Sequence, residues 1–164
     1  MATNLTLERL KEVYEYLPES GLFIRKLRTY RHKAGEVAGT LLGEGYIQIG
    51  IGGKQYRAHR LAFFYMTGAW PELEIDHVNG ERSDNRWENL REANRFQNSW
   101  NKKKSKANTS GYKGVSWDNT LQRYRASIRV NGKGIYLGVY TDPKLAGAAY
   151  IEAAQYYFGE YHQH

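Results

Sequence analysis

The sequence contains no cysteine among its 164 residues. This absence excludes disulfide bonds, zinc sites built from cysteine thiolates, and catalysis by a cysteine nucleophile. Long apolar runs are also missing, and no stretch approaches the roughly 20 apolar residues that a membrane-spanning helix needs. The first 17 residues carry charges throughout, which argues against a secretory signal peptide. We therefore expect a soluble protein that works in the cytoplasm, without a membrane partner.

Acidic residues are scarce in the last third of the chain. Residues 102–164 hold 10 Lys and Arg against 4 Asp and Glu, whereas residues 1–101 hold 14 against 13. The formal net charge of +7 is therefore concentrated in one part of the sequence. A basic segment of this kind predicts a polyanionic partner, although a surface that serves only solubility remains the alternative.

One stretch, residues 74–101, gathers side chains that suit hydrolysis. Asp76 precedes His77, Asn89 follows twelve positions after the histidine, and Asn98 follows nine after that. Carboxylate and amide oxygens are hard ligands for a divalent cation, and a neutral imidazole can accept a proton from water. The alternative is a polar turn without chemistry, since Asn and Asp are common in loops.

The local pattern of this stretch predicts strand, turn, strand and helix. Residues 73–77 have the apolar spacing of a short strand, and 89–93 can form a second one. Asn94 is a good helix N-cap, with Gln97 at the spacing of a capping box.

The residues Asp76-His77, Asn89-Leu90 and Asn98 resemble the motif of HNH nucleases, which have the ββα-metal fold. The third position is asparagine here, so the resemblance is to the HNN variant. It implies that His77 is the general base and that the side-chain oxygen of Asn89 holds its other ring nitrogen. It also implies that Asp76 and Asn98 bind one divalent metal, and such oxygen ligands favour Mg²⁺ or Mn²⁺ over Zn²⁺.

The segments ahead of this motif have clear local signals. We expect an amphipathic helix over 6–17, a strand over 22–27, a hairpin from 46–51 and 55–59 around Gly52-Gly53, and a buried helix over 59–67. Many HNH nucleases of this kind have a His-Arg pair before the motif, and His59-Arg60 stands at that place. Arg60 is a candidate phosphate ligand, whereas His59 is more simply explained by packing.

Residues 102–111 are basic and poor in apolar side chains, which predicts a linker. We expect Lys102, Lys103 and Lys104 to run along a DNA backbone.

The remainder predicts a second unit with three strands and a helix. The strands are expected at 112–117, 123–130 and 135–140, and Asp142-Pro143 should begin the helix. Arginines alternate along the middle strand and therefore share one face, opposite Tyr124, Ala126 and Ile128.

This unit resembles the APETALA2-type DNA-binding domain over roughly residues 110–160. The matching residues are Gly111 to Val115, Trp117, Tyr124 to Ile128, Asn131 to Lys133, Leu137-Gly138, and an alanine-rich helix that ends near Phe158-Gly159. The family often has tryptophan where Tyr124 stands. The resemblance implies a sheet laid in the DNA major groove, which admits a β-ribbon. The expected DNA contacts are Lys113, Trp117, Arg123, Arg125, Arg129 and Lys133.

Together these features predict an α+β protein with a nuclease domain at 1–101, a basic linker at 102–111 and a DNA-binding domain at 112–164. We expect a metal-dependent endonuclease that cuts double-stranded DNA, resembling site-specific homing enzymes that are often encoded by phages. One site per chain predicts one nick per bound chain, with monomer and homodimer both open. The rival is a DNA-binding regulator with an inactive site, and a non-specific nuclease or toxin is a third possibility.

Overall fold

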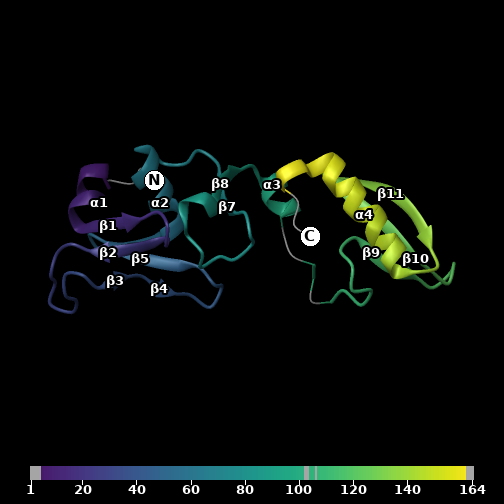
Figure 1. Ribbon diagram of the computed structural model, residues 1–164, viewed down its shortest axis with the longest axis horizontal. Coiled ribbons are helices and arrows are strands. Elements are labelled where there is room, and N and C mark those ends of the chain that lie inside the picture. Colours follow the sequence, from purple (N-terminus) through teal and green to yellow (C-terminus); the bar gives the residue numbers. More distant parts are fainter. Residues whose placement is uncertain (1–4, 102–103, 106, 162–164) are drawn as a thin grey trace. The chain divides into compact units, whose positions relative to one another are not determined.

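The computed structural model describes residues 5–101, 104–105 and 107–161. The chain divides into two compact units, Met1–Ala93 and Asn94–His164, and each is described by itself (Figure 1). The division falls inside the motif predicted at 73–101, between its second strand and its helix. The assignment of 1–101 to the nuclease and of 112–164 to DNA binding stays a prediction. Lys102 and Lys103 lie outside the described residues.

Two helices and three small antiparallel sheets make up the first unit. The helices are α1 (Leu7–Val13) and α2 (Ala58–Thr67). The first sheet contains β1 (Tyr14–Leu17), β2 (Leu22–Arg25) and β3 (Val37–Ala38), and the second contains β4 (Thr40–Leu41), β5 (Ile47–Ile51) and β6 (Lys54–Arg57). The third pairs β7 (Glu74–His77) with β8 (Leu90–Ala93), and a 3₁₀ turn at Trp87–Asn89 precedes β8.

The helix predicted over 6–17 is wrong in its second part. The Thr6 side chain caps the helix at its start, but α1 ends at Val13, and β1 follows at once. Tyr14 and Tyr16 alternate along β1, and both rings are buried against Phe23 of β2. Side chains two residues apart lie on the same face of a strand, so an extended chain buries both rings, which a helix would not place on one face. Pairing with β2 therefore replaces the helix that the pattern predicts.

The predicted hairpin and the helix after it are confirmed. Gly52 and Gly53 both have positive φ, the conformation of the tight turn that suits a twisted hairpin. Helix α2 follows β6 directly and buries Leu61 and Phe64 in the core of the unit, together with Ile75 of β7. The core thus supports the strand that carries Asp76 and His77.

The second unit is a three-stranded sheet with a long helix. Its elements are α3 (Arg95–Trp100), β9 (Val115–Asp118), β10 (Arg123–Val130), β11 (Lys133–Tyr140), α4 (Pro143–Phe158) and a 3₁₀ turn at Gly159–Tyr161, with strand order β11-β10-β9. Figure 1 shows α4 lying along one face of this sheet. Ile128 of β10 packs against Tyr150 and Phe158 of α4, and the Trp100 ring stacks on Phe158 at 4.4 Å.

The predicted helix starts in the second unit are confirmed. Asn94 and Gln97 form the reciprocal capping box at the start of α3. The side chain of Asp142 accepts from the backbone N–H of Lys144, with Pro143 in the first turn of α4. Along β10 the arginines are exposed while Ala126 and Ile128 are buried, as the alternation predicts.

The fold is therefore α+β, as predicted, with small antiparallel sheets and four α-helices among the described residues. None of the described helices has the length and apolar composition to cross a membrane.

Candidate active site

The last two residues of β7 carry the carboxylate and the imidazole. Asp76 and His77 are 5% and 4% exposed. The antiparallel register places Asp76 opposite Arg91 of β8, and the guanidinium donates to Asp76 Oδ2 from Nε at 3.1 Å and from Nη2 at 2.9 Å. The pair is charge-assisted and holds the carboxylate, a hard oxygen donor, beside the histidine.

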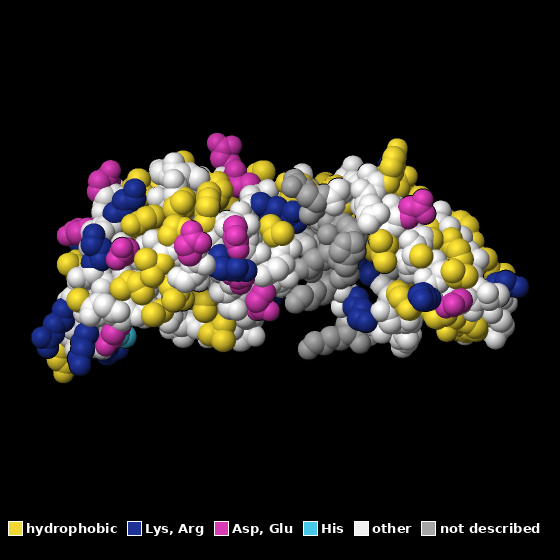
Figure 2. All heavy atoms as spheres, in the orientation of Figure 1, with side chains coloured by type: hydrophobic (Ala, Val, Ile, Leu, Met, Phe, Trp, Pro, Cys, Tyr) yellow, Lys and Arg dark blue, Asp and Glu magenta, His cyan; other side chains and the backbone are white. Residues whose placement is uncertain are grey.

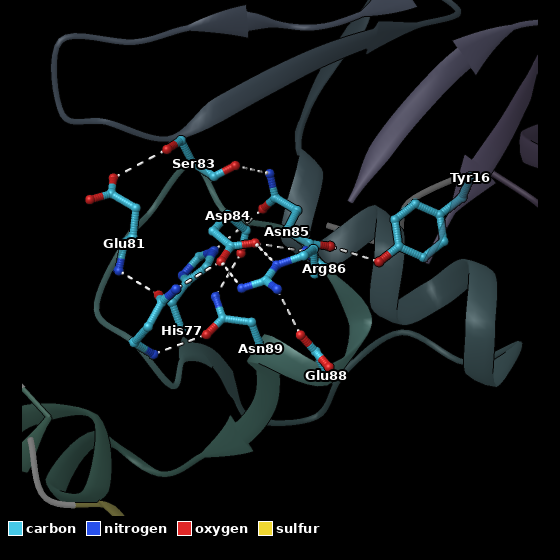
Figure 3. A network of polar contacts seen from close by, with 10 residues as sticks. Tyr16, His77, Glu81, Ser83, Asp84, Asn85, Arg86, Glu88 and Asn89 are labelled. Carbon is cyan, nitrogen blue, oxygen red and sulfur yellow. Dashed lines mark hydrogen bonds and ion pairs between the residues drawn. The ribbon is translucent and has the colours of Figure 1, made fainter. Parts of the chain in front are cut away.

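The loop between β7 and β8 is held closed by Asn89 (Figure 3). Asn89 Oδ1 accepts from the backbone N–H of Asn79 at 2.9 Å, and Asn89 Nδ2 donates to the carbonyl of Asp84 at 2.8 Å. The Asp84 carboxylate in turn accepts from Asn79 and Arg86. The hydrogen bond from the Arg86 guanidinium has the largest effect, and together these hydrogen bonds lower the pKa of Asp84 to about 2. The Asp84 carboxylate is therefore charged at neutral pH.

The imidazole of His77 is oriented by Asn85. Asn85 Oδ1 lies 3.3 Å from His77 Nε2, while Asn85 Nδ2 donates to the carbonyl of Ser83 at 3.0 Å. The second contact fixes which end of the amide faces the ring. Because an amide oxygen can only accept, this contact favours the tautomer with the proton on Nε2, in which Nδ1 is the basic nitrogen.

The expected role of Asn89 therefore needs correction. The structure gives its side chain two partners in the loop backbone, and the residue that faces the His77 ring is Asn85. Asn89 shapes the loop that presents Asn85, so it affects the orientation of His77 only indirectly. Nothing in the local spacing of Asn85 indicates a contact across the loop, so the sequence alone does not single it out.

The loop is also fixed to the hairpin of β1 and β2. The Tyr16 hydroxyl donates to the carbonyl of Asn85 at 2.7 Å, and the backbone N–H of Trp87 donates to the carbonyl of Pro18. Gly21 has φ +72°, and a Cβ there would lie 2.4 Å from the backbone nitrogen of Arg86. Only glycine allows so close an approach.

Burial sets the protonation state of the two neighbouring histidines. It lowers the pKa of His77, although Asn85, Asp76 and Asp84 act in the opposite direction. His59 of α2 lies edge-on to His77 with ring centroids 5.1 Å apart, and burial, then His77 and nearby arginines, lower the pKa of His59 to about 3. Both rings are therefore neutral at physiological pH, the state that a general base requires.

Asp76 suits a divalent metal by its chemistry. Its buried carboxylate is a hard oxygen donor, and a second one is predicted in Asn98, which lies in α3 of the second unit. Among the described residues no three His, Cys, Asp or Glu side chains cluster as metal ligands. The assignment of both ligands stays a prediction.

In the second unit the exposed face of the sheet is basic and aromatic. Arg123, Arg125 and Arg129 are exposed, and the Arg125 guanidinium lies 5.3 Å from the centroid of the Tyr136 ring. Lys133 is exposed at the start of β11. Trp117 pairs with Tyr124 across β9 and β10, so it belongs to the opposite face and does not extend the arginine surface.

Other predicted DNA contacts have partners within the protein. Lys113 Nζ donates to the carbonyl of Trp100 at 2.6 Å, and burial lowers its pKa. Lys104 donates to the carbonyl of Gly111. Arg60 lies near the carbonyls of Pro71 and Leu73, at 3.4 and 3.5 Å. Their roles on DNA stay predictions, and the contacts found are structural.

Comparisons with known proteins bear on the same stretch. The chain matches Protein 3.8 of Escherichia phage T7 with 42% identity over 59 residues, which is 36% of this chain and 49% of that protein. The chain thus spans about half the length of this curated relative. No solved structure matches the chain. A family model described as HNH endonuclease matches residues 56–100, and this segment contains Asp76, His77, Asn85, Asn89 and Asn98. Residues 56–100 are therefore the part of the chain that is similar to HNH endonucleases.

Proposed function

We propose that this protein is a metal-dependent DNA endonuclease that hydrolyses phosphodiester bonds at a site centred on His77. The observation that carries the proposal is a buried imidazole, with its pKa lowered by burial and its ring facing Asn85, next to the buried carboxylate of Asp76 and inside the segment that matches HNH endonucleases. A polar turn without chemistry would not require an oriented histidine next to a buried carboxylate.

In this mechanism His77 Nδ1 accepts a proton from the attacking water, while Asn85 holds Nε2 and keeps the ring in place. Asp76 and Asn98 would hold a divalent metal, which stabilises the negative charge that develops on the phosphate and on the leaving oxygen. Arg91 holds the Asp76 carboxylate in position. By resemblance to the family, the products carry 5′ phosphates.

We propose further that the second unit reads DNA, as its likeness to APETALA2-type domains suggests, and that the enzyme is site-specific and of homing type. The exposed arginines of β10 support this, because arginine can form two hydrogen bonds with a guanine edge. Figure 2 shows acidic and basic side chains interspersed over the visible face of the first unit. That mixed surface is consistent with placing most of the sequence-reading contacts elsewhere in the chain.

A plasmid-nicking assay in Mg²⁺ and in EDTA tests the enzyme against its rival. Cutting that requires the metal supports the nuclease. Firm binding without cutting in Mg²⁺ or Mn²⁺ would instead identify a DNA-binding regulator whose site is inactive.

The Mg²⁺ requirement should change when Asn98 is replaced. In Asn98→Ala we expect the Mg²⁺ concentration for half-maximal cutting to rise before activity is lost, because a site with few ligands loses one oxygen. The measurement is the initial rate against Mg²⁺ concentration. Ser99→Ala is the matched control, since Ser99 is exposed on the same helix and bonds only locally. Identical titrations for wild type and Asn98→Ala would remove Asn98 from the ligand set.

The cleavage rate should fall on the acid side of neutrality. His77 must be neutral to accept a proton, so activity is lost as pH falls through its pKa. Because burial lowers that pKa, the loss should begin below the ordinary value of 6.5. Single-turnover rates at saturating Mg²⁺ measure this acid limb. A rate that stays constant through the titration, with chemistry limiting, would contradict the assignment.

A further inference from the structure

Two arginines meet on one aromatic ring next to His77. The ring of Tyr46 lies 5.2 Å from that of His59 and 6.0 Å from that of His77, between centroids. The guanidinium carbons of Arg57 and Arg82 lie 5.0 and 4.9 Å from the Tyr46 centroid. These side chains come from the residue just before β5, the end of β6 and the loop after β7. Three separate segments thus place two positive charges beside the base.

Glu44 holds both arginines, but it leaves hydrogen-bonding capacity on Arg57. Arg82 donates to the Glu44 carbonyl at 2.9 Å, and Arg57 Nη2 lies 3.1 Å from Glu44 Oε2. Arg57 Nη1 is buried and finds no hydrogen-bond acceptor among the described residues. The Glu44 side chain is 64% exposed, so its carboxylate can move away at little cost.

The start of α2 adds further polar groups at the same place. Arg57 occupies the N-cap position and its side chain makes no capping hydrogen bond. His59, in the first turn, is 7% exposed, and its Nδ1 has no partner among the described residues. The N-terminus of a ten-residue helix favours an anion through its N–H groups and its dipole. Like charges and unpaired donors together are stabilised by a bound anion.

We propose that Arg57 and Arg82, stacked on Tyr46, bind a backbone phosphate of nucleic acid and thereby hold the neighbouring phosphodiester against His77. This inference rests on the proposed function, since it supplies the substrate contact of that same site. The Glu44 carboxylate occupies Arg57 in the free protein and gives way to the phosphate. Both arginines act as positioning residues, because they hold the strand and take no part in the proton transfer.

The test measures the affinity of the full chain for a DNA duplex in EDTA, against salt concentration, for Arg57→Ala and Arg82→Ala. Each should weaken binding about tenfold at low salt, and each should reduce the slope of log affinity against log salt by about one unit, since one phosphate contact is lost. Arg82→Lys should restore the slope, because it keeps the charge. Arg9→Ala is the control, since Arg9 is exposed and paired with Glu12 on α1.

Glu44→Gln separates this site from a purely structural cluster. Removal of the competing carboxylate should raise the affinity for DNA. If the Arg57–Glu44 pair is only structural, the affinity should instead stay the same or fall. Single-turnover cutting in Mg²⁺ should show a raised KM for both arginine variants.

Unchanged affinity and salt slope in both alanine variants would overturn the phosphate site, whether or not the wild type cuts DNA. If both variants have reduced slopes but the wild type fails to cut DNA in Mg²⁺ or Mn²⁺, the phosphate site is supported and the proposed nuclease is overturned. Circular dichroism of each variant, together with the slope of Arg82→Lys, distinguishes a lost contact from a lost fold.

Discussion

Replacement of His77 by alanine is expected to slow DNA cleavage by about 10²–10⁴-fold, the usual effect of losing a general base. In the proposed mechanism the imidazole serves proton transfer, and because burial lowers its pKa it contributes little charge to DNA binding. Affinity for the same duplex in EDTA should therefore remain close to that of the wild type. Single-turnover rates in Mg²⁺, with affinities measured in EDTA, check both parts.

Asn85→Ala is the informative companion to this variant. It leaves the imidazole present but removes the acceptor on Nε2, so we expect a smaller loss of rate than in His77→Ala. A His77→Ala protein that keeps more than half of the wild-type rate would exclude His77 as the base, whatever Asn85→Ala does.

Replacement of Arg91 by methionine is expected to lower the free energy of unfolding by about 3–5 kcal/mol, because it leaves the buried charge of Asp76 without its guanidinium. The side chains of Arg91 and Asp76 are 14% and 5% exposed, so solvent screens this pair weakly. Urea unfolding followed by circular dichroism measures the loss. The double variant with Asp76→Asn should recover much of it, since the unpaired charge is then absent.

The Arg9–Glu12 pair supplies the control for this experiment. Its side chains are more than half exposed, so Arg9→Met should change stability by at most about 1 kcal/mol. Mg²⁺ should also raise the Tm of Arg91→Met more than that of the wild type, because a cation on Asp76 replaces the missing guanidinium. Equal stability of Arg91→Met and wild type would show that Asp76 does not depend on Arg91.

Features encoded within a few residues could be predicted from the sequence. The capping box of Asn94 and Gln97, the Gly52-Gly53 hairpin and the alternation along β10 each depend on neighbours in the chain, and all three are present. The positions of Asp76 and His77 at the end of a strand were predictable for the same reason.

Features that depend on how distant segments meet could not be predicted. The contact of Arg91 with Asp76 needs the register of β7 and β8, which the intervening loop and its 3₁₀ turn determine. The placement of Asn85 depends on Tyr16, which is 69 positions away. The helix expected over 6–17 fails likewise, because Tyr14 and Tyr16 are buried by pairing with a strand that local periodicity does not reveal.

The closeness of Gly21 to the loop backbone limits how far this motif can be transplanted. Residues 56–100 contain His77 and its loop, yet Tyr16, the Pro18 carbonyl and Gly21 hold that loop from outside the segment. A chimeric nuclease built by grafting only those residues onto another scaffold would inherit the histidine without the support that orients it. The smallest portable module would therefore begin at the first hairpin, about forty residues ahead of the segment that matches the family model.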